Sequence, residues 1–132
     1  MNYLLDTHTI LFSLFSPSKL GIRARDAILD PSSSVGVSVV SFWEISLKSS
    51  IGKLHLEGSS PDALPDACVQ MGFSIVGLSA EDAASFDSLP RFGHKDPFDR
   101  MLVWQAIRQK RIMVSQDSAF RTYAASGLKV LW

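Results

Sequence analysis

The sequence of 132 residues contains a single cysteine and no long apolar run. Cys68 has no partner within the chain for a disulfide, and no histidine lies near it in residues 66–70 to activate a thiol. We expect it to be a buried structural thiol. The start of the chain also lacks a basic region followed by an apolar stretch, which argues against secretion and membrane insertion. These absences place the protein in a reducing cytoplasm.

Net charge is also absent, because 13 Lys and Arg residues balance 13 Asp and Glu residues. A nonspecific nucleic-acid coat protein would carry an excess of positive charge. The two parts of the chain differ, however: residues 1–90 hold 5 basic and 10 acidic residues, and residues 91–132 hold 8 basic and 3 acidic ones. A basic C-terminal third is typical of an edge that contacts phosphates, and it is at least as common on an uneven solvated surface. It supports a nucleic-acid substrate only weakly.

Length and composition predict one domain over residues 1–132. A chain of this size with 46% hydrophobic residues buries a core without disulfides or a structural metal. Short apolar or β-branched runs alternate with helical periodicity along it. The expected strands are residues 3–5, 35–40, 73–76, 112–114 and 128–131. The expected helices are residues 7–15, 21–29, 41–52, 66–71, 79–89, 97–110 and 118–126. This alternation predicts an α/β fold with a parallel sheet and helices on both faces.

Residues 91–106 contain the densest group of charged side chains in the sequence. Asp96 followed by Pro97 is typical of a helix start, with Asp96 as the N-cap and Asp99 at the third helical position. An acid there also interacts favourably with the helix dipole. Ser41 and Glu44 fit a capping box in the same way. Capping alone is therefore a sufficient explanation for each acid taken singly.

The second explanation for these acids is that they come together at one site in the folded protein. Asp6, Glu44 and Asp117 each follow an expected strand, so all three should lie at the carboxyl edge of a parallel sheet. Asp99 begins the helix that precedes residues 112–114, and a helix antiparallel to that strand begins at the same edge. Four carboxylates at one edge would repel one another, at roughly 1 kcal/mol per pair in water and roughly 4 kcal/mol near a protein surface at about 4 Å. We therefore expect a bound divalent cation.

The donor chemistry favours Mg²⁺ or Mn²⁺, because the acids offer hard oxygen ligands and no Cys or His pair has zinc spacing. Such a cleft suits phosphoester hydrolysis, in which the metal stabilises phosphate charge and helps to ionise water. His94 is either a support or substrate contact or a surface-loop histidine. Lys95 and Arg100 flank the acids and are candidate phosphate contacts, although Arg100 has the alternative role of holding the cleft together.

Three rival α/β enzymes or binders lack their required residues here. A response-regulator receiver needs an aspartate after the third strand, where residues 76–78 offer none. A dinucleotide-binding domain needs a glycine-rich turn after the first strand, and a haloacid-dehalogenase-type phosphatase needs an acid at position 8, which is His8. A catalytically silent module that binds RNA or a protein remains the alternative from another class. Metal-dependent cleavage would distinguish it from a nuclease.

Four segments of the sequence form a recognisable set: Leu5-Asp-Thr-His8, Ser41-Phe-Trp-Glu-Ile-Ser-Leu-Lys48, His94-Lys-Asp-Pro-Phe-Asp-Arg-Met-Leu-Val-Trp-Gln-Ala106 and Val114-Ser-Gln-Asp117. Together they resemble the PIN-domain ribonucleases, and most of all the VapC-type toxins of toxin–antitoxin pairs. The similarity runs through nearly the whole chain in the right order. Ser115 stands where the family often has threonine, and Trp104 stands where it often has alanine.

The resemblance implies a three-layer α/β/α fold around a central, mostly parallel five-stranded sheet. It further implies a Mg²⁺- or Mn²⁺-dependent endoribonuclease, a homodimer, and a larger complex with a cognate antitoxin that blocks the site. Matched residue by residue, the family's acids fall on Asp6, Glu44, Asp99 and Asp117, with Thr7 and Ser115 as hydroxyl neighbours. Asp96 is assigned mainly to the helix start and Asp99 to the metal.

Overall fold

The sheet of this protein, seen in a computed structural model that describes residues 1–132, has five strands that are all parallel. The strand order is β3-β2-β1-β4-β5. The strands are β1 (Asn2–Leu5), β2 (Ser34–Ser38), β3 (Ser74–Val76), β4 (Ile112–Val114) and β5 (Lys129–Leu131). The first strand is thus central, and each crossover between strands contains helix. All five predicted strands are present, and the predicted parallel arrangement is confirmed.

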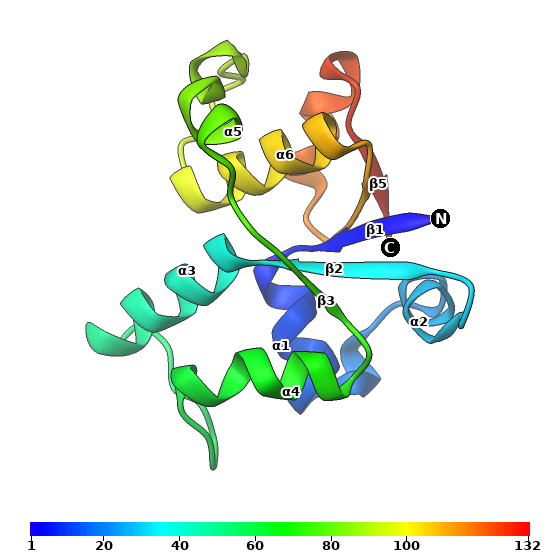
Figure 1. Ribbon diagram of the computed structural model, residues 1–132, viewed down its shortest axis with the longest axis vertical. Helices are drawn as coiled ribbons and strands as arrows, with labels where there is room; N and C mark the ends of the chain where they lie inside the picture. The colour runs from blue at the N-terminus through cyan, green and yellow to red at the C-terminus, as the bar shows by residue number, and fades with distance from the viewer.

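Helices cover both faces of this sheet and make the predicted three layers (Figure 1). The α-helices are α1 (Thr7–Phe15), α2 (Ile22–Leu29), α3 (Val39–Ser50), α4 (Leu64–Gln70), α5 (Ala80–Ala84) and α6 (Pro97–Gln109). The 3-10 helices are η1 (Pro17–Lys19), η2 (Pro61–Ala63), η3 (Phe86–Ser88) and η4 (Ser118–Ser126). In Figure 1, α5 and α6 lie on one side of the sheet and α1, α2 and α4 on the other. None of the helices combines the length and apolarity needed to span a membrane.

The two larger of the three core clusters follow from the alternation of side chains along the strands. Leu4 pairs in register with Met113, and both belong to the cluster under α6 and η4. Leu5 pairs with Val114, and both belong to the cluster under α1, α2 and α4. Successive residues of a strand point to opposite faces, so two-sided burial requires continuous apolar runs. The apolar runs of β1 and β4 are therefore what place their carboxyl ends inside the protein.

The junction of β2 and α3 differs from the prediction. We expected a strand to Val40 and a helix capped by Ser41, but β2 ends at Ser38 and α3 begins at Val39. Ser38 is the N-cap, and its hydroxyl accepts a hydrogen bond from the Val40 N–H at 3.0 Å. Two β-branched valines favour a strand by propensity, but the serine cap and burial of Val40 start the helix earlier. Glu44 therefore lies in the second turn of α3 and caps nothing.

The helix over residues 79–89 is also shorter than predicted. Ser79 is its N-cap, but α5 ends at Ala84 and a short 3-10 turn follows. Trp104 on α6 explains part of this geometry, because its indole N–H donates to the Ser85 hydroxyl at 3.1 Å. The bulky side chain is thus accommodated between α6 and the end of α5.

Candidate active site

Asp6 lies at the carboxyl end of the central strand and is buried. Its Oδ1 accepts hydrogen bonds from the Thr9 N–H at 2.9 Å and the Thr9 hydroxyl at 2.6 Å, so it caps α1. Its Oδ2 accepts from the Ser115 hydroxyl at 2.5 Å. Burial raises the pKa of Asp6 above its usual range, while the hydrogen bonds from Ser115 and Thr9 act to lower it. The carboxylate is held rigidly by two elements that are far apart in sequence.

Glu44 projects from α3 toward the same place and is only 4% exposed. Its Oε1 accepts a hydrogen bond from the Thr7 hydroxyl at 2.6 Å, and its Oε2 pairs with the Lys48 ammonium one turn further along the helix. Thr7 directly follows Asp6, so a single hydroxyl connects the end of β1 with the acid on α3. A buried carboxylate without a capping role is uncommon unless it serves a site.

Asp99 completes a cluster of three acids. Its pKa is raised to about 6 by burial, by the charges of Asp96 and Glu44, and by that of Asp6, while His94 acts to lower it. Repulsion of this kind requires the four carboxylates to lie near one another. The structure therefore brings Asp6, Glu44 and Asp99 together, as expected, and adds Asp96 to them.

Asp96 has the capping geometry predicted for it. Its Oδ1 accepts hydrogen bonds from the Phe98 N–H at 2.9 Å and the Asp99 N–H at 3.1 Å. Asp99, at the third position of α6, is left to face the other acids. The two aspartates are only three residues apart, but Asp96 caps the helix and Asp99 does not.

Asp117 is not brought into this cluster. Its side chain is exposed and accepts a hydrogen bond from the Ala119 N–H at 2.9 Å, which caps η4. Only its backbone N–H is connected to the site, through a 3.0 Å hydrogen bond to the Ser115 hydroxyl. The expectation of four converging carboxylates is met by three, because the start of η4 engages the fourth.

The cluster fits a hard cation in its chemistry. It holds four neighbouring carboxylates against one ammonium, that of Lys48, and a cation would relieve the repulsion that raises the pKa of Asp99. No three Asp, Glu, His or Cys side chains stand close enough to ligate one ion directly. Mg²⁺ commonly keeps several waters and binds only one or two carboxylates, so this spacing agrees with such an ion.

His94 supports Asp99 from the loop before α6. Its Nε2 lies 3.4 Å from Asp99 Oδ2, and its Nδ1 lies 3.2 Å from the hydroxyl of the buried Tyr123. A chain of contacts thus runs from the acid through the imidazole to the core. Of the two roles considered for His94, this position matches the support of a neighbouring acid.

The two candidate phosphate contacts differ in position. Lys95 is exposed beside the acids. Arg100 is buried: its Nη2 donates to the carbonyls of Leu89 at 3.0 Å and Pro90 at 3.4 Å, and its guanidinium lies over the Phe86 ring. Arg100 therefore ties Leu89 and Pro90, the segment before the active-site loop (residues 91–96), to α6. This burial does not fit the expected phosphate contact.

Sequence reasoning missed Lys48 and Thr9. Lys48 is four residues after Glu44 on α3, a spacing that places two side chains on the same helix face, so it could have been found. Thr9 could not, because its role depends on Val114: its hydroxyl is 2.6 Å from Asp6 Oδ1 and 3.0 Å from the Val114 carbonyl. The two residues respectively balance the charge of Glu44 and fix the position of Asp6.

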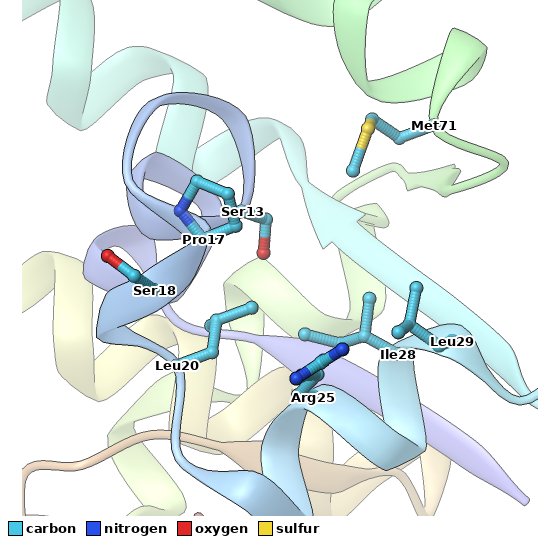
Figure 2. A pocket seen from close by; sticks show the side chains of 8 residues that line it. All are labelled: Ser13, Pro17, Ser18, Leu20, Arg25, Ile28, Leu29 and Met71. Carbon is cyan, nitrogen blue, oxygen red and sulfur yellow. The ribbon is translucent and has the colours of Figure 1, made fainter.

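A separate apolar pocket of about 270 Å³ lies between α1, η1, α2 and the end of α4 (Figure 2). Its lining residues are Ser13, Pro17, Ser18, Leu20, Arg25, Ile28, Leu29 and Met71. None of the clustered acids lines it. It is a feature of the surface on the α1 side of the sheet.

Comparison with solved structures identifies similar folds. One similar chain comes from the structure of VapBC2 from Rickettsia felis bound to a fragment of promoter DNA. It aligns with this protein with a TM-score of 0.72 and 14% sequence identity, and the alignment covers 99% of this chain and 98% of that chain. A chain of DNA-bound VapBC from Salmonella typhimurium has a TM-score of 0.70 and 16% identity, covering 99% and 97%. A chain of VapBC-1 from nontypeable Haemophilus influenzae has a TM-score of 0.62 and 14% identity, covering 99% and 97%.

Comparison of sequences gives a family. No match is found among curated proteins. Residues 3–126 match the PIN domain family, and this span contains all the clustered acids described above. This chain therefore belongs to the PIN domain family.

Proposed function

We propose that the protein is a metal-dependent endoribonuclease of the VapC type, the toxin of a toxin–antitoxin pair. The observation that carries this proposal is the group of Asp6, Glu44 and Asp99, in which partial burial of Asp99, and after it the charges of the neighbouring carboxylates, raise the pKa of Asp99 to about 6. Membership of the PIN domain family and likeness to chains of VapBC assemblies support it.

In this proposal Asp6, Glu44 and Asp99 would hold Mg²⁺ or Mn²⁺ at the carboxyl edge of the sheet, one or two of them directly and the rest through waters of the ion. The ion would supply positive charge for a phosphate and lower the pKa of water. The Thr7 and Ser115 hydroxyls orient two of the carboxylates, and His94 holds the third. Lys95 is free to bind an RNA phosphate. Asp117 stays a proposed member of the site, although its side chain must turn away from η4 to reach the others.

The alternative is a catalytically silent PIN domain that binds RNA or a protein partner. Neighbouring like charges of this kind are unfavourable in a pure binding module, because one ammonium, that of Lys48, offsets the desolvation and mutual repulsion of four carboxylates only in part. That consideration favours the nuclease.

The test is cleavage of a mixed RNA pool by the purified protein with Mg²⁺, with Mn²⁺ and after exhaustive chelation. We expect cleavage with metal alone, and loss of cleavage in Asp6→Asn with its fold retained, since asparagine also caps a helix. Both ions should raise the melting temperature, because they bind only the folded state. Wild-type cleavage by Asp6→Asn, or cleavage unaffected by chelation, would overturn the assignment.

Two apolar surfaces are available for the proposed partners. Trp43 on α3 is 64% exposed and packs edge-on against Phe98 at 5.0 Å between ring centroids, with Val39 and Leu47 one turn away on either side. We assign this surface to a homodimer. The pocket in Figure 2 is concave, and we assign it to an apolar segment of the antitoxin in the larger complex.

A further inference from the structure

A basic pocket lies at the end of the sheet opposite to the carboxylates. It has a volume of about 560 Å³ and is lined by Lys110 and Arg111 after α6 and by Lys129 on β5, together with Asn2 at the start of β1. The acids lie at the carboxyl ends of parallel strands, whereas these residues lie at the amino ends. The helix α6 begins at the acids and ends at this pocket, so its 13 residues separate the two by roughly 20 Å.

The three cations of the pocket have no carboxylate partner. The ion pairs of the protein involve Lys48, His55, His94 and Arg108, and none involves Lys110, Arg111 or Lys129. Lys and Arg residues near the C-terminus of a helix often do no more than interact favourably with the helix dipole. Arg108 already occupies the last turn of α6, and Lys129 comes from a strand, so the dipole does not account for the group.

Arg111 is fixed in place by one backbone carbonyl and one side chain. Its Nη1 donates to the Tyr3 carbonyl at 3.2 Å, and its Nε donates to Gln109 Oε1 at 2.9 Å. A methyl group at Gly36 would lie 2.8 Å from the same Nη1, so the glycine in β2 leaves the space that the guanidinium uses. Burial without a counterion lowers the pKa of Arg111. The guanidinium of Arg111 is therefore already positioned and has no carboxylate partner.

Lys110 has an unfavourable backbone for a residue with a side chain. Its φ is 54°, the left-handed conformation that closes α6 and that glycine adopts at little cost. It is the only residue other than glycine with a positive φ in the protein. A lysine at this position strains the helix end by roughly 1–2 kcal/mol relative to glycine, and it adds a positive charge to the pocket.

We propose that this basic pocket is a second RNA contact, in which Lys110, Arg111 and Lys129 bind phosphates of the RNA backbone away from the site of cleavage. The inference rests on the proposed ribonuclease function. Two exposed lysines around a fixed guanidinium suit a backbone that crosses the surface, because lysines bind phosphates as mobile point charges. The pocket has no aromatic side chain on which a base could stack, so the contact is independent of sequence.

The test compares the double variant Lys110→Gly/Lys129→Ala with a control, Arg23→Ala/Lys53→Ala, which removes two exposed cations elsewhere. Glycine accepts the backbone of residue 110, so the variant should fold at least as well as the wild type. Binding of a mixed-sequence RNA is measured in metal-free buffer over a range of salt concentrations. We expect about a fivefold loss of affinity for each cation removed and a salt slope shallower by about 1.4, with the control nearly unchanged. Equal affinity and slope in the two double variants would overturn the proposal.

Inorganic pyrophosphate is used to test whether the pocket binds a small phosphate compound instead of RNA. Amide NMR signals of residues 110, 111, 127 and 129 should shift on its addition to the wild type, and RNA should displace it. If pyrophosphate binds and RNA does not compete, the RNA proposal is overturned in favour of a small phosphate compound. Cleavage is assayed separately with Mg²⁺: a wild type that binds RNA through this pocket without cleaving it would refute the proposed nuclease and leave the pocket assignment standing.

Discussion

Asp99 makes the stability of the metal-free protein depend on pH. Its pKa of about 6 in the folded protein lies above the ordinary value of 3.8, so the folded state holds the proton more tightly between these values. This stabilisation is complete below pH 3.8 and is lost as the pH rises through about 6. It amounts to at most about 3 kcal/mol.

The measurement is denaturant unfolding of metal-free wild type and Asp99→Asn at about pH 4.5 and about pH 7.5. The wild type should lose more stability than the variant over this interval. The difference between the two proteins therefore reports Asp99 together with its interaction with the neighbouring Asp6. Parallel pH profiles would show that Asp99 titrates normally.

Asp96 and Asp99 should respond differently to substitution. Asparagine retains the cap that Asp96 provides, so Asp96→Asn should keep much of the activity, whereas Asp96→Ala should lose about 0.5–2 kcal/mol of stability. Asp99→Asn should abolish cleavage with little loss of stability, because it removes a repelled charge. Cleavage rates and denaturant melts of the three variants decide the matter. An inactive Asp96→Asn beside an active Asp99→Asn would reverse the two roles.

At the scale of elements, the sequence predicts the strands and most helices because their signals are local. The cap at Asp96 and the apolar runs of β1 and β4 are examples. The predicted start of α3 was wrong, because the strand preference of Val39 and Val40 is outweighed by the Ser38 cap and by packing.

The site was predictable in part for the same reason. Acids at strand ends indicate the edge where Asp6, Glu44 and Asp99 meet. The direction of a side chain depends on neighbours that are remote in sequence, so the outward turn of Asp117 and the burial of Arg100 could not be predicted.

Arg100 should act on the stability of the segment before the active-site loop. Arg100→Ala removes two hydrogen bonds to the carbonyls of Leu89 and Pro90 and the contact with Phe86, and should lower stability by about 2–4 kcal/mol. Hydrogen exchange should speed up in residues 85–91. Lys95→Ala, which removes an exposed cation nearby, is the control and should be nearly neutral. Equal stability of the two variants would contradict a structural role for Arg100.

At the scale of the whole molecule, the exposed surface around Trp43 predicts self-association. Figure 1 shows α3 projecting beyond the sheet, where a second copy could reach it. Trp43→Asp should convert a homodimer to a monomer in sedimentation experiments, because a charge is unfavourable at the centre of an apolar interface. Leu29→Asp, on the pocket in Figure 2, is the matched control and should remain dimeric. A dimer that survives Trp43→Asp would assign self-association to another surface.

The central position of β1 has a consequence for synthesis of the protein on the ribosome. Asp6 is made more than 100 residues before the groups that hold it, Ser115 and the Val114 carbonyl behind Thr9. At about 5–20 residues per second, roughly 5–20 s pass between them. During that interval the nascent chain carries its first acid without the strand that positions it. A site built in this order stays unassembled until the ribosome has added β4 and Ser115, which, for the nuclease proposed above, would protect its own messenger while β1 to α6 are being made.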